Sequence, residues 1–365
     1  MRVGIDGRKI PGSKANGPLA SLDHAKDLGV SGIFFRTVLD MSPTLDPGEL
    51  RDIRQRADEL GLYLESGLGK VNPYAMAEAP ELRQIGGGDT LLGFRRMMTA
   101  CAEIGCLELW AGTANYKPYP GRLAYDRFRT DVSWEDQLVA TEKYLRTLAP
   151  IARDLGIHIN LETHEEITTF ELVRLVEAVG PDAIGIVFDT SNPMQRAEHP
   201  VRAAERVAPY VRQTHFKDAA LAVDADGVLY QERPLGQGLI DFEAILRILA
   251  VGTPELTLSI ENAQPWEEVA VTYPTFRADQ IPSRTQTVVE VFDEAWQAAH
   301  PDLSVRELAA YLGLAQDGSR RIAAGDLASI EDCTPTTFGF TDAVDAARSS
   351  IKYLRALVDN LGLAT

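Results

Sequence analysis

The stretch that decides the fold is Ile157-His158-Ile159-Asn160-Leu161-Glu162-Thr163-His164. Apolar and polar side chains alternate along it, which is the pattern of a β-strand whose two faces meet different surroundings. Before it, residues 134–155 carry apolar side chains at helical spacing. A long amphipathic helix that leads into a short strand is the repeating unit of parallel β/α architecture.

The same unit recurs along the chain, because short β-branched or aromatic runs alternate with longer segments of helical periodicity. Eight such runs, with no break in composition, predict an α/β fold, a closed (β/α)8 TIM barrel, in preference to an open doubly wound sheet. Two stacked Rossmann-like halves are the strongest alternative, but no predicted strand is followed by a Gly-x-Gly-x-x-Gly turn. The predicted strands are Val3–Asp6, Gly32–Arg36, Leu62–Ser66, Leu107–Gly112, Ile157–Glu162, Ile184–Asp189, Val211–Lys217 and Leu256–Asn262.

Insertions follow the third, fourth and seventh predicted strands, and they hold residues 70–74, 115–119 and 224–238. Connections that follow strands lie at the C-terminal face of such a barrel, where active sites are built, so we expect these insertions to cover a substrate. The repeats end near residue 296. We therefore predict a TIM barrel over residues 1–296 and a C-terminal helical extension over residues 297–365, packed on the barrel or on a partner chain.

The composition of the chain excludes several classes of function. The chain has 365 residues, of which 45% are hydrophobic, and this is enough apolar material for a large core. Its formal charge of -17 opposes a nucleic-acid partner, which requires a basic surface. No run is long and apolar enough for a membrane span, and the start of the chain reads as a strand and not as a signal peptide. Cys101, Cys106 and Cys333 have no disulfide or metal spacing. We expect a cytoplasmic protein.

Four consecutive predicted strands each end in a residue able to bind a metal. Strand alternation turns these side chains into the barrel, and three carboxylates buried together require a compensating cation. Taken singly, each acid could instead belong to a hydrogen-bond network. Together they predict a divalent-metal site that prefers Mn²⁺ and also suits Mg²⁺, Co²⁺ or Zn²⁺. The predicted ligands are Glu162, Asp189, His215 and Glu261.

Two further residues are candidate catalytic groups. His164 lies two positions beyond Glu162 on the same strand face, where an imidazole tuned by Glu165 or Glu166 could act as general base. The alternative is a histidine exposed to solvent on a loop. Lys217 could place its charge beside a developing oxyanion, or could form a salt bridge to Asp218 or another neighbour.

Candidate substrate-binding residues come from the strand ends and the insertions. Trp110 could stack on a sugar ring, although aromatic residues at strand ends more often serve packing. Arg36 ends the second predicted strand and has the same two interpretations. Lys70 and Asn115 belong to the insertions after the third and fourth strands. We predict that these four residues bind the substrate.

The chain resembles the xylose-isomerase-like barrel superfamily of sugar isomerases and epimerases. The likeness runs through residues 160–164, Phe188-Asp189-Thr190-Ser191-Asn192, His215-Phe216-Lys217-Asp218 and Ser259-Ile260-Glu261-Asn262, and it covers residues 1–296. In that superfamily a Glu, an Asp, a His and a Glu from strands five to eight bind the metal, which implies the same roles here.

More narrowly, residues 4–11, 69–74 and 112–116 are similar to the large (alpha) subunit of bacterial C-glycoside deglycosidases. This resemblance implies a 3-keto-glycoside substrate and a small β-rich subunit that completes a hetero-oligomer.

Two reactions start from the same enediolate. His164 would remove the proton next to a metal-polarised ketone. Expulsion of the aglycone from C1 then gives carbon–carbon cleavage, whereas reprotonation at the neighbouring carbon gives a keto-sugar isomerase or epimerase. A barrel that binds a metal only as a ligand-binding scaffold, or a nuclease, would also be compatible with the four ligands, but the acidic charge opposes the nuclease.

Overall fold

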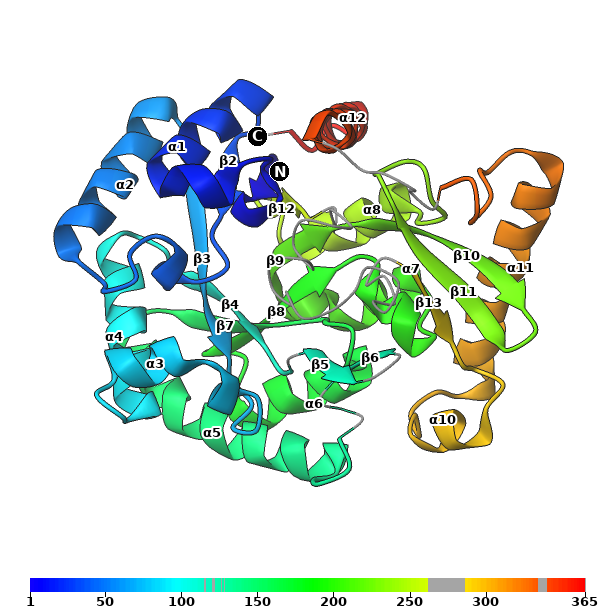
Figure 1. The fold of residues 1–365 in the computed structure, drawn as a ribbon, viewed down its shortest axis with the longest axis horizontal. Helices are drawn as coiled ribbons and strands as arrows, with labels where there is room; N and C mark the ends of the chain where they lie inside the picture. The colour runs from blue at the N-terminus through cyan, green and yellow to red at the C-terminus, as the bar shows by residue number, and fades with distance from the viewer. Residues whose placement is uncertain are drawn as a thin grey trace.

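Eight parallel strands close into a barrel in a computed structural model of the protein, which describes residues 1–114, 116–119, 122–125, 127, 129–261, 286–333 and 340–364. Neighbouring strands follow the order β1-β12-β9-β8-β7-β4-β3-β2, so that β1 pairs with both β12 and β2. Figure 1 looks into this ring, with the helices arranged around it. The strands are β1 (Arg2–Asp6), β2 (Gly32–Phe34), β3 (Tyr63–Lys70), β4 (Glu108–Gly112), β7 (His158–Glu162), β8 (Ile184–Asp189), β9 (Val211–Phe216) and β12 (Thr257–Ile260).

The predicted closed barrel is confirmed, and the alternative of an open sheet is wrong, because the β1–β12 ladder closes the ring. Each predicted strand contains or overlaps an observed one. The largest difference is β3, which continues four residues beyond the predicted end at Ser66, to Lys70. Asn262, the predicted end of the eighth strand, lies outside the described residues.

Most of the helices that surround the barrel begin at capping residues, and several of them end at a glycine. Asp46 and Asp89 accept main-chain N–H groups at the starts of α2 and α4, and Ser133 does so for α5. Gly156 ends α5 in the left-handed conformation that glycine adopts without steric cost. The surrounding helices are α1 (Ser13–Leu28), α2 (Pro47–Leu60), α3 (Pro80–Ile85), α4 (Thr90–Glu103), α5 (Trp134–Leu155), α6 (Thr169–Val179), α7 (Pro200–Val207) and α8 (Phe242–Gly252).

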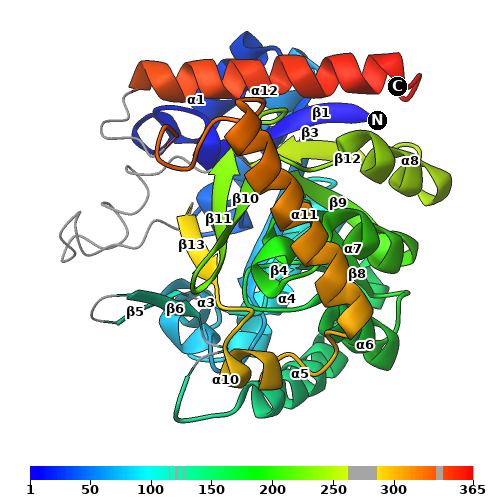
Figure 2. The ribbon, with the colours of Figure 1, turned by 90° about the vertical axis from the view of Figure 1, so that its right-hand side faces the viewer.

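Two of the insertions predicted as loops form β-structure instead. The insertion after β4 pairs β5 (Tyr116–Tyr119) with β6 (Arg122–Tyr125), and the one after β9 is a hairpin of β10 (Asp218–Asp224) and β11 (Gly227–Arg233). A later strand, β13 (Gln286–Val289), pairs with β11 to make a three-stranded sheet, which Figure 2 shows beside the barrel. Only the pairing of β13 with β11 joins segments far apart in the sequence, which leaves no short-range signal; the β5–β6 and β10–β11 hairpins join neighbouring segments, and the sequence analysis did not predict them.

Asp218 fixes the base of this hairpin. Its carboxylate accepts main-chain N–H groups of Ala219 at 2.8 Å, Gly236 at 2.9 Å and Gly238 at 2.8 Å. A Cβ on Gly238 would lie 2.2 Å from an oxygen of this carboxylate, so the close approach requires glycine at that position. The hairpin is therefore tied down directly at the end of β9.

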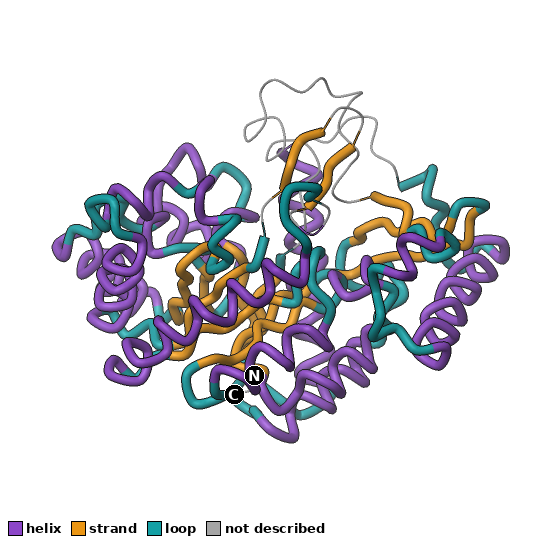
Figure 3. The backbone as a smooth tube through the Cα atoms, turned by 90° about the horizontal axis from the view of Figure 1, so that it is seen from below, coloured by secondary structure: helices purple, strands orange, loops and turns teal. Residues whose placement is uncertain are grey.

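The C-terminal segment packs on the barrel and its hairpin. After the short α10 (Glu294–Ala298), α11 (Val305–Ala324) runs along β10, and α12 (Phe340–Asn360) crosses the barrel near β1. The terminal ammonium of Met1 donates to the carbonyl of Leu363, so the chain ends lie side by side (Figure 3). Helical structure of the tail is confirmed, and the boundary at residue 296 stays a prediction. Among the described helices, none combines the length and the apolar content that a membrane span requires.

Candidate metal centre

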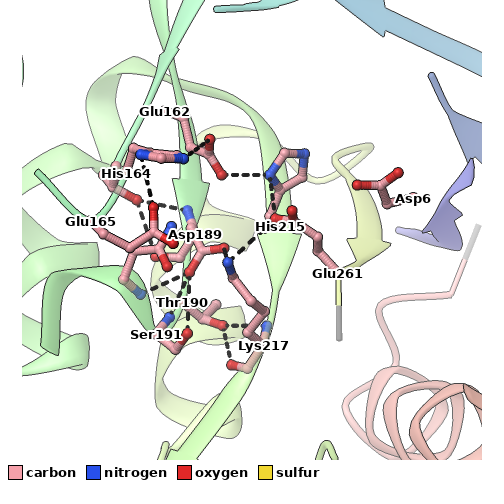
Figure 4. A network of polar contacts seen from close by, with 12 residues as sticks. Asp6, Glu162, His164, Glu165, Asp189, Thr190, Ser191, His215, Lys217 and Glu261 are labelled. Carbon is pink, nitrogen blue, oxygen red and sulfur yellow. Dashed lines mark hydrogen bonds and ion pairs between the residues drawn. The ribbon is translucent and has the colours of Figure 1, made fainter. Parts of the chain in front are cut away.

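The four predicted metal ligands come together at the C-terminal end of the barrel. Glu162 ends β7, Asp189 ends β8, His215 lies on β9, and Glu261 follows β12. All four are buried, and one potential ligand atom from each lies within 4.8 Å of the others. Figure 4 shows their side chains converging from separate strands. Strand alternation turned these residues inward as the sequence predicted.

Contacts inside the cluster join imidazole to carboxylate. His215 Nδ1 lies 2.8 Å from Glu162 Oε1 and 3.1 Å from Glu261 Oε2. Asp189 is oriented through its other oxygen, Oδ1, which accepts the main-chain N–H groups of Ser191 at 2.9 Å and Asn192 at 2.8 Å. These two bonds leave Asp189 Oδ2 directed to the cluster.

The cluster fits a divalent cation on its own chemistry. Within the described part of the chain, Asp189 Oδ2 and Glu261 Oε2 are buried and accept no hydrogen bond. Their nearest partners are ion pairs, with Lys217 Nζ at 3.2 and 3.5 Å from the two oxygens and His215 Nδ1 at 3.1 Å from Glu261 Oε2, and a divalent ion would supply further positive charge to these buried carboxylates. Three carboxylates and one imidazole suit Mn²⁺, Mg²⁺, Co²⁺ and Zn²⁺.

The pKa values of two carboxylates in the cluster are shifted in opposite directions. Burial raises the pKa of Asp189 to about 6, against the opposing effect of Lys217. Burial also acts to raise the pKa of Glu162, but the imidazoles of His215 and His164 outweigh it and hold that pKa at about 2. The repulsion between buried negative charges is thus offset partly by neighbouring positive charges, and a metal bound here would take the place of the proton that His215 shares with Glu162 and Glu261.

His164, the predicted base, is buried on the turn after β7 and is not exposed to solvent. Its Nε2 lies 3.9 Å from Glu162, and its Nδ1 lies 2.8 Å from Glu165 and in hydrogen-bond contact with Glu166. Thr113 donates to the other oxygen of Glu166 at 2.6 Å. Burial lowers the pKa of His164, but Glu165 and Glu166 outweigh this effect and raise it to about 9. The carboxylates that the sequence suggested as tuning groups therefore contact the imidazole.

Lys217 pairs with two of the predicted metal ligands and not with Asp218. Its Nζ lies 3.2 Å from Asp189 Oδ2 and 3.5 Å from Glu261 Oε2. A buried ammonium in this position offsets the two carboxylates and lies at the edge of the cluster. Its predicted contact with an oxyanion stays a prediction.

Two of the predicted substrate-binding residues, Arg36 and Lys70, lie beside the indole ring of a third, Trp110. Trp110 donates from Nε1 to Glu162 Oε2 at 2.9 Å. Arg36 Cζ lies 5.5 Å and Lys70 Nζ 5.2 Å from the centroid of its ring. Arg36 also binds Glu261. The ring is 2% exposed, so it supports the metal ligand directly. Asn115 lies outside the described residues.

Several residues at this end of the barrel were not predicted from the sequence. Asp6 ends β1, is fully buried and pairs with Arg36 at 2.9 Å. An inward acid at the end of a strand was a signal that could have identified it. Arg127 and Glu232 reach the site from an insertion and from the hairpin, where no periodic pattern indicates them.

Comparisons with known proteins agree with this geometry. The 3-oxo-isoapionate decarboxylase of Pectobacterium atrosepticum is 26% identical over 256 residues, which cover 70% of this chain and 80% of the relative. The structure of 3-keto-D-glucoside 4-epimerase, YcjR, from E. coli aligns with a TM-score of 0.53 at 17% identity, over 75% of this chain and 96% of that one. The IolI protein, solved with a zinc atom, aligns with a TM-score of 0.52 at 17% identity, over 85% and 99% of the two chains. At these identities the structural matches establish the fold alone.

The family described as xylose isomerase-like TIM barrel matches residues 22–272, which is more than half of the chain. This match contains Glu162, Asp189, His215 and Glu261, the four residues that the closed barrel brings together. The protein therefore belongs to the xylose isomerase-like TIM barrel family and is an enzyme of the wider group of sugar isomerases, epimerases and lyases.

Proposed function

We propose that this protein is the alpha subunit of a metal-dependent C-glycoside deglycosidase, which cleaves the carbon–carbon glycosidic bond of 3-keto-C-glycosides by elimination. The observation that carries the proposal is the pairing of a buried four-ligand cluster with a buried imidazole–carboxylate pair, His164 and Glu166, on the adjoining turn. Such a site can remove a proton beside a ketone and stabilise the negative charge that forms.

Glu162, Asp189, His215 and Glu261 would hold the divalent ion, with Mn²⁺ as the preferred metal. When bound, the ion supplies Lewis acidity at the substrate ketone. Lys217, beside Asp189 and Glu261, adds a positive charge at the same edge of the cluster. We assign substrate contacts to Arg36, Lys70, Trp110 and Asn115.

The proton steps belong to His164. In its neutral form, which a nearby metal ion would favour over the imidazolium, it accepts the proton from C2 of the sugar, and the electrons of the broken C2–H bond pass into an enediolate across C2 and C3. When the C3 ketone re-forms, these electrons make a C1=C2 double bond, and the C1–aglycone bond breaks with its pair on the aglycone carbon. His164 returns the proton to that carbon. Glu165 and Glu166 stabilise the imidazolium between the two steps.

The names of the compared proteins support a ketone at C3 of a carbohydrate. One relative is a 3-oxo-isoapionate decarboxylase, and one protein of similar fold is a 3-keto-D-glucoside 4-epimerase. The second name also favours the runner-up activity, a divalent-metal-dependent keto-sugar isomerase or epimerase. That reaction shares the enediolate and differs only in where the proton returns.

We further propose that a small β-rich subunit completes a hetero-oligomer in the cytoplasm. Val288 on β13, Val223 on β10 and Phe292 are large apolar side chains left exposed on or beside the three-stranded sheet. A partner protein would cover exposed apolar side chains of this kind.

The test supplies the metal-loaded protein with a 3-keto-C-glucoside and, in parallel, with free ketoses. The proposal expects release of the free aglycone, detected by chromatography. Conversion of a ketose, or epimerisation of the keto-glucoside without aglycone release, would decide for the isomerase or epimerase instead. Each assay is run with and without the co-expressed small subunit, because that comparison tests the partner separately from the chemistry.

A further inference from the structure

The hairpin strand β11 has two faces with different partners. Gln231 donates to the carbonyl of Ile330 at 3.0 Å, and Arg233 donates to the carbonyl of Ser329 at 3.1 Å, so this face packs on the C-terminal segment. Tyr230 and Glu232 alternate with these residues and lie on the opposite face. That second face is therefore turned away from the C-terminal segment.

Tyr230 shows where the second face is directed. Its hydroxyl lies 3.1 Å from Ser191 Oγ, and the N–H of Ser191 donates to Asp189 at 2.9 Å. Glu232 pairs in register with Ala219, two residues after Lys217, whereas Tyr230 pairs with Leu221, farther along the hairpin. Glu232 thus lies closer than Tyr230 to the barrel end of the hairpin, on the face that covers the metal centre.

The carboxylate of Glu232 has charged neighbours, but one of its oxygens accepts no hydrogen bond from the described residues. This oxygen, Oε2, is buried. Burial raises the pKa of Glu232 to about 7, although Lys217 and Lys9 oppose that effect. Lys217 directs its ammonium to Asp189 and Glu261, at 3.2 and 3.5 Å, and donates no hydrogen bond to Glu232 Oε2. A buried acceptor left open costs free energy unless a donor arrives.

We propose that Glu232 is a specificity-determining residue whose carboxylate accepts a hydrogen bond from a hydroxyl of the bound sugar. Sugar hydroxyls are donors that a carboxylate oxygen binds strongly, and a site built around such a bond rejects an analogue that lacks the hydroxyl. The assignment rests on the proposed function, since it requires a polyhydroxylated substrate beside the metal centre. It places a recognition residue on the hairpin, outside the eight barrel strands.

The test compares wild-type protein with Glu232→Gln and Glu232→Ala, each loaded with metal. Binding of a 3-keto-C-glucoside and of its 4-deoxy and 6-deoxy analogues is measured by titration calorimetry, together with KM and kcat. Loss of a hydrogen bond to a charged group predicts a roughly 10- to 100-fold rise in KM and Kd for the parent sugar. For one deoxy analogue, wild type and Glu232→Ala should bind equally well. Asp226→Asn, an exposed carboxylate at the hairpin tip, is the matched control and should bind as wild type does.

The two proposals can fail separately. If wild type binds the sugar but releases no aglycone, the proposed cleavage reaction is contradicted. The role of Glu232 can still be tested, because it depends only on sugar binding. Equal affinity of wild type and both Glu232 variants for all three sugars, with metal content and melting temperature unchanged, would overturn the role of Glu232. A variant that loses affinity for the parent and for both deoxy analogues by the same factor would also overturn it, because a specific hydroxyl contact must disappear with its hydroxyl.

Discussion

Arg127 donates from Nη1 to the main-chain carbonyl of Glu166 at 2.9 Å. The same guanidinium binds the carboxylate of Glu171 at 2.9 Å and, from Nη2, the carbonyl of Ala299 at 2.6 Å. Its side chain is 3% exposed. One buried residue thus joins the turn that carries His164 and Glu166 to α6 and to the C-terminal segment.

Arg127→Gln should lower kcat more than it changes KM. The variant removes the bond that holds the Glu166 carbonyl, so the His164–Glu166 pair loses its fixed position, and a displacement of this kind costs about 10-fold or more in rate. Steady-state kinetics on the keto-glycoside measures the effect. Arg129→Lys is the control, because Arg129 pairs with exposed Asp131 and should leave kcat near wild type. An unchanged kcat in Arg127→Gln would show that the turn holds its position without this contact.

Loss of a predicted ligand should lower the metal content of the protein, and removal of the metal should lower its free energy of unfolding. Asp189→Ala deletes one of the four clustered carboxylate and imidazole groups, so the purified variant should contain little divalent metal by elemental analysis. Wild type at 100 times its Kd for the ion should gain about 2.7 kcal/mol of stability over the chelated form. A chelator that changes neither activity nor melting temperature would contradict the metal assignment.

His164→Ala should lose turnover and keep the metal. The imidazole lies 3.9 Å from Glu162 and is not one of the four clustered ligands, so its removal leaves the donor set complete. Loss of a general acid–base group predicts a fall of roughly 100- to 10,000-fold in kcat. Metal content is measured on the same preparation. Near-normal rates would show that another group moves the proton.

His300 should make the protein sensitive to acid. It is 3% exposed, its Nδ1 donates to the carbonyl of Trp296 at 2.6 Å, and its Nε2 faces Arg196 at 3.2 Å. Burial, with the charges of Arg196 and Arg127, lowers its pKa to about 2. A depressed histidine pKa gives stability that is present above the unfolded value of about 6.5 and is lost as the pH falls below it.

At pH 5 this loss amounts to roughly 2 kcal/mol. His300→Gln keeps an acceptor for Arg196 but cannot be protonated. Urea unfolding at pH 7.5 and pH 5 should therefore show a smaller fall in the free energy of unfolding for the variant than for wild type. Parallel changes in the two proteins would show that His300 takes up no proton on unfolding.

The barrel, and the convergence of the four predicted metal ligands, could be predicted because both depend on local pattern, whereas the metal-binding role stays a prediction. Alternation within Ile157–Glu162 fixes which side chains face inward, and repetition of strand and helix fixes the parallel order. Glu232 and Arg127 could not be found this way. Glu232 lies on a hairpin that was predicted only as an insertion, so the direction of its side chain was not predicted, and Arg127 is held by contacts with residues far along the chain, such as Ala299.

The sequence alone determined that four strands end in inward side chains able to bind a metal, because the side-chain period of a strand is two residues wherever the strand lies. Only the tertiary structure decided which charges meet those ligands. Lys217 turns to Asp189 and Glu261 and not to Asp218, and His164 is buried between carboxylates and not exposed. These outcomes depend on packing and burial in three dimensions, and no spacing along the chain encodes them.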